Sequence, residues 1–215
     1  MKYLKILGLA AVATAALAAL FGAGTASATV LCSETKTPCP AAQKWPVNTV
    51  FDFDLKANTV ATLTNTAGGV LGSCQAGTAK GQITKAGGMA ETVIASVAKG
   101  DLTWLGCNAA VKTEAGGTLE IHQIAGTDNG TITASGFEVK LSIGLVDCFY
   151  QTGTGADLGA VIGSKNPMLA INIVLTSNGE KSDVACPATV KWIAEYTLKE
   201  PKPGGVVTPL FVEPE

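Results

Sequence analysis

Short segments in which apolar and polar residues alternate run through most of this chain, and they constrain its fold more than any other feature. In residues 51–56, three apolar residues alternate with Asp52, Asp54 and Lys56. Residues 137–143 and 190–196 repeat the pattern, with apolar side chains at every second position. A period of two is that of a β-strand with one buried face. The chain therefore predicts many half-buried strands.

Turn signals separate these segments. Asp128-Asn129-Gly130 and Asn178-Gly179 are typical of tight turns between antiparallel strands. Residues 168–176 are almost continuously apolar, which predicts a central strand covered on both faces. Residues 89–99 carry a helical stripe, but their β-branched side chains and the surrounding glycines favour a strand. The whole pattern predicts an all-β domain, either an antiparallel β-sandwich or an antiparallel barrel.

The cysteines predict covalent cross-links between the strands. All six lie beyond the first 28 residues of the chain: Cys32, Cys39, Cys74, Cys107, Cys148 and Cys186. An even number of cysteines in an exported chain indicates three disulfides, and the sequence leaves fifteen possible pairings. The sequential pairing is preferred, because its first bridge closes a short Pro-containing loop and the others each tie strands within one half of the domain. A zinc site is not expected, because no C-x-x-C occurs and the chain has a single histidine.

The first 28 residues have the order of a bacterial export signal. Two lysines precede an apolar run over 6–21, and Ala26-Ser27-Ala28 forms an A-x-A cleavage site. The apolar run is shorter than the roughly 20 residues that a membrane-spanning helix needs. A lipid anchor on Cys32 is not expected, because the bulky Leu31 precedes it. We therefore expect a secreted protein, located outside the cell or in the cell envelope, with no membrane span in the mature chain.

Composition divides the remaining chain in two. Residues 29–198 form the predicted β-sandwich or barrel domain, and residues 199–215 form a tail rich in proline and glycine. Residues 206–212 within this tail are apolar enough to add an edge strand.

The charge of the mature chain excludes some classes of partner. Two of the 15 basic residues lie in the export segment, so 13 lysines face 17 acidic residues. No basic stripe for nucleic acid is present, and no arginine occurs for bidentate binding of phosphate or carboxylate. We expect no nucleic-acid partner; an envelope or protein partner stays open.

No coherent catalytic set is present in the sequence. His122 is the only imidazole, no G-x-S-x-G motif occurs, and His122 shares a strand face with Glu120. Asp52 and Asp54 stand about 7 Å apart along one strand face, a spacing that acid–base catalysis or calcium binding can use. A polar, solvent-facing strand surface is the preferred interpretation. We name no catalytic residue, no cofactor and no metal site.

Five aromatic residues are the candidates for a stacking surface: Trp45, Trp104, Trp192, Tyr150 and Tyr196. Carbohydrate binding would need several of them exposed in a row. Trp104 and Trp192 alternate with apolar neighbours near cysteines, which favours core positions for both.

The cysteine frame is similar to that of a group of secreted proteins. Ala28 to Cys32, Pro38-Cys39-Pro40, the spaced cysteines and Cys186-Pro187 together resemble uncharacterised small secreted proteins of actinomycete-type bacteria. The resemblance implies a secreted β domain with disulfides and brings no catalytic residues with it.

These observations rank three functions. A non-catalytic structural or interaction protein of the exterior or envelope comes first, because no catalytic set is present. A carbohydrate- or small-ligand-binding β-sandwich comes second. The third is a small secreted hydrolase that uses Asp52, Asp54, Glu120 or His122.

Overall fold

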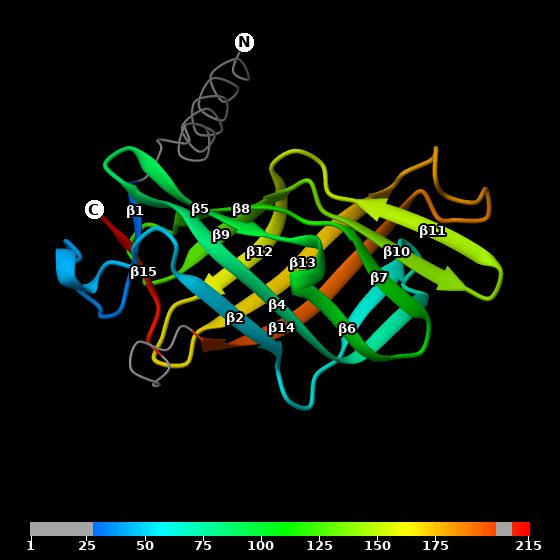
Figure 1. The fold of residues 1–215 in the computed structure, drawn as a ribbon, viewed down its shortest axis with the longest axis horizontal. Helices are drawn as coiled ribbons and strands as arrows, with labels where there is room; N and C mark the ends of the chain where they lie inside the picture. Colours follow the sequence, from blue (N-terminus) through cyan, green and yellow to red (C-terminus); the bar gives the residue numbers. More distant parts are fainter. Residues whose placement is uncertain (1–27, 201–207) are drawn as a thin grey trace, which may run out of the picture.

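The computed structural model describes residues 28–200 and 208–215, and almost all of its regular structure is β (Figure 1). The predicted export segment lies outside the described residues, apart from Ala28. The first strands are β1 (Thr29–Cys32), β2 (Val50–Leu55), β3 (Ala61–Asn65), β4 (Val70–Gly88), β5 (Glu91–Val97), β6 (Leu102–Cys107), β7 (Ala110–Ala115) and β8 (Gly117–Gln123). The remaining strands are β9 (Gly130–Ser135), β10 (Glu138–Ile143), β11 (Val146–Gln151), β12 (Ala156–Ile162), β13 (Met168–Ser177), β14 (Thr189–Glu200) and β15 (Phe211–Pro214). Two single-turn 3₁₀ helices, η1 (Ala41–Gln43) and η2 (Lys99–Asp101), complete the described elements.

The sheet is a closed antiparallel barrel of eight strands with further strands attached. Each strand of the ring pairs with the next in the order β2, β4, β5, β8, β9, β12, β13 and β14, and β14 closes the ring by pairing with β2. The barrel form of the predicted all-β fold is therefore the correct one, and the sandwich alternative is wrong.

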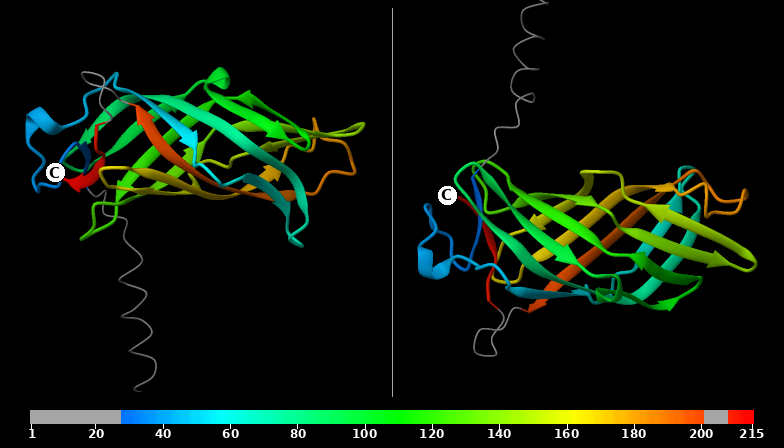
Figure 2. Two further views of the ribbon diagram at one scale, coloured as in Figure 1. Left: turned by 90° about the horizontal axis from the view of Figure 1, so that it is seen from below. Right: turned by 45° about the horizontal axis from the view of Figure 1, so that its top comes forward.

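The attached strands lengthen this barrel into an elongated body (Figure 2). In five pairs of consecutive strands, the second strand continues the line of the first along the wall: β2 and β3, β5 and β6, β7 and β8, β9 and β10, and β11 and β12. The long strands β4, β13 and β14 carry partners in both halves. The molecule thus has a first half built around β5, β8, β9 and β12, and a second half built around β6, β7, β10 and β11.

Kinks between the paired elements separate the two halves. Gly136 stands between β9 and β10 with φ +85°, a backbone conformation that favours glycine. A Cβ on Gly117, at the start of β8, would lie 2.2 Å from the Ser135 carbonyl oxygen and 2.5 Å from the Phe137 ring. Glycine at these positions lets the strands bend while Phe137 turns inward.

The alternating segments bury their apolar side chains as predicted. Phe51, Phe53 and Leu55 are all at most 9% exposed, and so are the apolar residues of β14 from Val190 to Leu198, except Ile193 on its outer face. Residues 89–99 include β5, so the strand was the correct choice there.

Two burial predictions are wrong. Residues 168–176 are covered on one face only, since Asn172 and Val174 in β13 are exposed. A barrel wall is a single layer, so its outer face meets solvent even along a very apolar strand. Asp52 was expected to face solvent, yet it is only 8% exposed under its ion pair with Lys80.

One end of the barrel is covered by the two ends of the described chain (Figure 1). β15 pairs with β1, and β1 also pairs with the last residues of β4. The predicted strand over 206–212 overlaps β15, although residues 206 and 207 lie outside the described residues. All three disulfides form in the sequential pairing that was preferred: Cys32–Cys39, Cys74–Cys107 and Cys148–Cys186.

Candidate ligand-binding cavity

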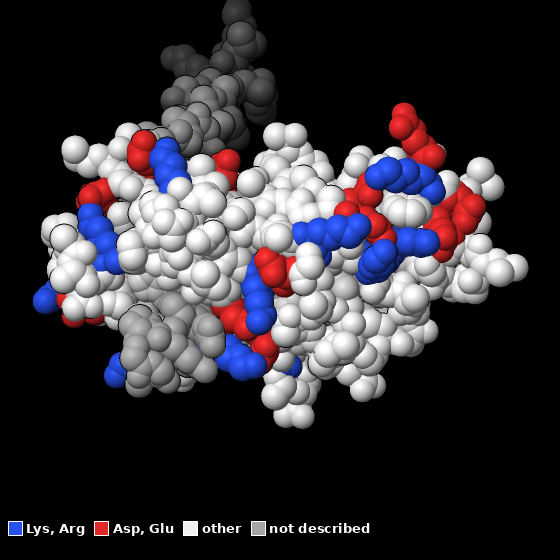
Figure 3. Space-filling view, in the orientation of Figure 1, with Lys and Arg blue, Asp and Glu red and all other residues white. Residues whose placement is uncertain are grey.

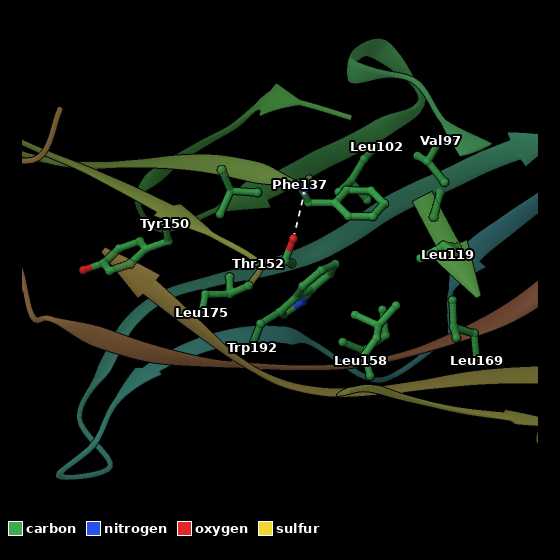
Figure 4. A pocket seen from close by; sticks show the side chains of 13 residues that line it. Val97, Leu102, Leu119, Phe137, Tyr150, Thr152, Leu158, Leu169, Leu175 and Trp192 are labelled. Carbon is green, nitrogen blue, oxygen red and sulfur yellow. Dashed lines mark hydrogen bonds between the residues drawn. The ribbon is translucent and has the colours of Figure 1, made fainter. Parts of the chain in front are cut away.

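An apolar cavity of about 40 Å³ lies inside the barrel where its two halves meet (Figure 4). It is lined by Ala79, Val97, Leu102, Leu119, Phe137, Val139, Tyr150, Thr152, Leu158, Leu169, Ile171, Leu175 and Trp192. About 10–15 Å³ is enough for one water molecule, so the cavity holds roughly three groups of that size. Eight-stranded barrels either fill with side chains or hold one small ligand. This interior is largely filled by side chains, and the cavity is a small space left between them.

The kinks create this space. Phe137 lies in the break between β9 and β10, and Thr152 lies in the break between β11 and β12. The Phe137 N–H donates to the Thr152 hydroxyl at 3.1 Å, and the Thr152 N–H donates to the Phe137 carbonyl at 3.0 Å. Figure 4 shows Phe137, Leu102 and Val97 on one side of the space and Trp192, Leu158 and Leu169 on the other. Side chains from both halves therefore line the same cavity.

Polar groups in the interior lack partners. The Trp192 indole N–H and the hydroxyls of Tyr150 and Tyr196 are buried without a hydrogen bond. Burial raises the pKa of both tyrosines, so both hydroxyls stay protonated. An unpaired buried donor costs about 1–3 kcal/mol, and native proteins contain few of them. In Figure 4 the Tyr150 hydroxyl points away from the other labelled side chains, and of the two buried indoles with an unpaired N–H, Trp45 and Trp192, Trp192 is the one that lines the cavity.

The wall beside the cavity has a seam between β6 and β7. Both strands lie within the described residues, and β6 pairs only with β4 while β7 pairs only with β10. Side chains hold the seam together instead of a backbone ladder. The Thr113 hydroxyl donates to the Leu102 carbonyl at 2.8 Å, and it accepts from the Trp104 indole N–H at 3.1 Å. Thr113 is 5% exposed and therefore acts as a buried latch.

An open groove of about 290 Å³ runs over this seam. Its lining comprises Lys99, Gly100, Leu102, Thr103, Trp104, Val111, Lys112 and Thr113. Lys99 and Lys112 both pair with Glu114, at 2.8 and 3.2 Å. Hydrogen bonds from the two lysines lower the pKa of Glu114, so it stays ionised and the three groups carry a net charge of +1. Elsewhere on the face in Figure 3, lysines and acidic residues lie in mixed clusters with wide uncharged surface between them.

The structure does not gather the four candidate hydrolase residues. Asp52 and Asp54 lie on β2, and each pairs with a lysine, Lys80 at 3.2 Å and Lys199 at 3.0 Å. Glu120 and His122 lie on β8, where their side chains approach each other to 3.8 Å. β4 and β5 stand between β2 and β8, so the two pairs occupy separate parts of the wall.

The aromatic candidates lie mainly in the core. Trp45, Trp192, Tyr150 and Tyr196 are all at most 6% exposed. Trp104 is partly buried at the seam, and its ring lies 5.0 Å from that of Trp192. These five residues therefore do not form an exposed row for stacking.

In residues 28–200 and 208–215, no group of three or more histidine, cysteine, aspartate or glutamate side chains is placed to hold a metal ion. No helix in the same residues has the length and hydrophobicity needed to span a bilayer.

Sequence reasoning missed the residues that shape the cavity and the seam. Gly136 interrupts an alternating segment directly before Phe137, and an isolated glycine in a strand pattern is a signal for a bend. Nothing in the sequence marked Thr113, Lys99 or Lys112, because their role depends on two strands that approach without pairing.

Comparison of the chain with protein-family models, curated proteins and solved structures gives no match. The cavity and the seam are therefore interpreted from their own geometry.

Proposed function

We propose that this protein is a non-catalytic barrel that binds a small, mainly apolar molecule in its interior. The observation that carries the proposal is the apolar cavity between the two halves, which is lined by Trp192, a residue whose buried indole N–H is unpaired. Apolar cavities stay dry and accept apolar guests. Each methylene that moves from water into such a space contributes about 0.8 kcal/mol. An oxygen on the guest that faces Trp192 adds a hydrogen bond.

The proposal develops the second of the three ranked functions, with a barrel in place of a sandwich. We place the activity outside the cytoplasm, since three disulfides and an export-type first segment are typical of secreted proteins. A structural or interaction role in the envelope stays a prediction; the cavity gives ligand binding the more specific support.

The test is nuclear magnetic resonance of the ¹⁵N-labelled protein, with propane and acetone as probes, whose three and four heavy atoms match a cavity with room for roughly three water-sized groups. Trp192 and Trp45 are both buried and both have an unpaired indole N–H, but only Trp192 lines the cavity. We expect both probes to shift the Trp192 N–H resonance, the ketone more strongly, and to leave that of Trp45 in place.

A pair of variants on β4 provides the control. Ala79 lines the cavity, so Ala79→Leu fills it and abolishes the shift, whereas Ala76→Leu on the exposed face retains the shift. The proposal is wrong if neither probe moves the Trp192 resonance, or if Ala79→Leu binds the probes as well as wild type does.

A further inference from the structure

The groove over the seam lies directly outside the cavity. Leu102 lines both spaces, so its side chain is the partition between them. Figure 4 places Leu102 at the margin of the cavity beside Phe137. Along the rest of the described barrel, neighbouring strands of the wall are joined by backbone hydrogen bonds in both halves. The seam is thus the place where the wall opens by breaking side-chain contacts alone.

The two spaces differ in chemistry. The cavity walls are almost wholly apolar, whereas the groove combines apolar Trp104 and Val111 with hydroxyls and two exposed lysines. A ligand that fits both spaces has an apolar tail and a polar head. The excess positive charge at Lys99, Lys112 and Glu114 favours an acidic head.

The small volume of the cavity limits which ligand tails can enter it. A cavity with room for roughly three water-sized groups accepts the last carbons of an unbranched chain and excludes a fused ring system. The remaining carbons lie past Leu102 and Trp104 in the groove, which is about 290 Å³.

From these observations we propose that the ligand is an unbranched acidic amphiphile. Its tail enters the cavity through the seam between β6 and β7, and its carboxylate lies in the groove beside Lys99 and Lys112. This inference rests on the proposed function and adds the class of ligand and its route. The step is reversible binding, in which no covalent bond forms or breaks.

Octanoate, 1-octanol and octyltrimethylammonium are suitable probes, because they share a tail and differ in the charge of the head. Titration of the wild-type protein, followed by calorimetry and by the Trp192 N–H resonance, gives their relative affinities. We expect octanoate to bind more tightly than octanol and octanol more tightly than the cation. The expected preference for octanoate over octanol is about two- to tenfold, since exposed charge pairs contribute little each.

Two variants of the groove test the entry route of the tail and the role of the lysine charges separately. Gly100 lines the groove, and a Cβ there meets nothing within 4 Å, so Gly100→Trp fills the groove without a clash at Cβ. We expect it to weaken octanoate binding or slow its entry by about tenfold. The double variant Lys99→Gln/Lys112→Gln is expected to bind octanol as before and to lose the preference for octanoate.

Matched controls lie elsewhere on the surface. Gly179 is in a turn where a Cβ also meets nothing within 4 Å, so Gly179→Trp adds the same side chain away from the groove. Lys36 and Lys85 pair with single glutamates, and Lys36→Gln/Lys85→Gln removes the same charge. Both controls are expected to bind like wild type.

The outcomes distinguish the two proposals. If propane and acetone bind but the groove variants behave like their controls, or if octyltrimethylammonium binds as tightly as octanoate, the inference is overturned and the proposed function stands. If none of these apolar probes shifts Trp192 in the wild-type protein, both proposals fail.

Discussion

The two halves of the barrel use the same long strands but close in different ways. In the half that contains β5, β8, β9 and β12, every strand pairs with its neighbours through backbone hydrogen bonds. In the half that contains β6, β7, β10 and β11, the ring is completed across the seam by the Thr113 latch, which bonds to Leu102 and Trp104 on β6. The cavity lies where the closed wall of the first half meets the wall of the second half, which is interrupted at the seam between β6 and β7.

Because of this difference, the closed half resists opening, whereas the seam offers a route to the cavity. A backbone ladder opens only when many hydrogen bonds break together, whereas a seam of a few side-chain contacts opens locally at lower free energy. Exposed strand edges invite pairing with other chains, and natural proteins cover them. The bulky groove residues and the latch at the seam perform this covering here.

The largest expected effect comes from a cross-link of the open half. The Cys74–Cys107 bridge joins β4 to β6 across a sequence separation of 33, so its replacement by serines is expected to cost about 4 kcal/mol of unfolding free energy. Cys32–Cys39 closes a separation of 7, and its loss is expected to cost about 2.5 kcal/mol. Urea unfolding of both variants measures the difference. An equal or reversed order would contradict a contribution that grows with the length of the loop that each bridge closes.

A matched pair of valine variants compares the packing of the two walls. Val93 on β5 is fully buried in the closed half, and Val111 on β7 is partly buried beside the seam. We expect Val93→Ala to cost about 2 kcal/mol and Val111→Ala less than about 1 kcal/mol, because the first leaves a larger cavity. Thermal and urea unfolding test this. Equal losses would contradict the looser packing of the seam.

Removal of the latch is expected to have a smaller effect on stability and a local effect on dynamics. Thr113→Val keeps the shape of the side chain but leaves the Leu102 carbonyl and the Trp104 N–H without their partner. The expected cost is about 1–2 kcal/mol. Amide hydrogen exchange should accelerate in β6 and β7 and stay unchanged in β8 and β9. Thr113→Ser retains the hydroxyl and serves as the control; similar exchange in both variants would argue against a latch.

Two buried glutamates in different parts of the barrel predict opposite responses to pH. Burial raises the pKa of Glu138 on β10, but hydrogen bonds from Lys181 and Asn178 outweigh it, so the pKa is lowered overall. Burial and the neighbouring Asp128 raise the pKa of Glu213 on β15, against a hydrogen bond from Thr37 that lowers it. The ionised form is therefore favoured by folding at Glu138, and the protonated form is favoured at Glu213.

The sign of each effect follows from this linkage. Glu138 stabilises the fold above its unfolded pKa, and this contribution is lost as the pH falls through its lowered folded pKa. The contribution of Glu213 is present below its unfolded pKa and is lost as the pH rises through its raised folded pKa. At pH 7, Glu138→Gln should lower the melting temperature and Glu213→Gln should raise it, each by less than Thr113→Val lowers it. Melting curves from pH 3 to 8 test this, and shifts of the same sign would contradict the assignment.

Most of the strands were predictable because their signal is local. In β2 and β14 every second side chain faces the core, so the apolar residues of 51–55 and 190–198 mark both the strand and its buried face. The same reasoning failed at residues 168–176. A long apolar run is found in strands covered on both faces and, as here, in a strand of a single-layered wall whose outer face stays apolar.

The candidate site was much less predictable. Trp192 was correctly expected in the core, but the cavity that it lines depends on side chains from strands far apart in sequence. Asp52, Asp54, Glu120 and His122 drew attention by residue type, yet two strands separate the first pair from the second. Thr113 carries no sequence signal, because a buried threonine becomes a latch only where two strand edges meet without pairing.

The sequence by itself determined that the described chain is built of strands, that its six cysteines form three bridges, and which face of most strands is buried. These properties depend on the period of two along a strand and on cysteine number, and both can be counted along the chain. Only the tertiary structure decided that the strands close into a barrel, that the barrel has two halves, and that the wall between β6 and β7 stays open. Gly136 gives a local signal for its kink, but strand register and the resulting cavity follow from contacts between distant residues, and such contacts leave no local pattern in the sequence.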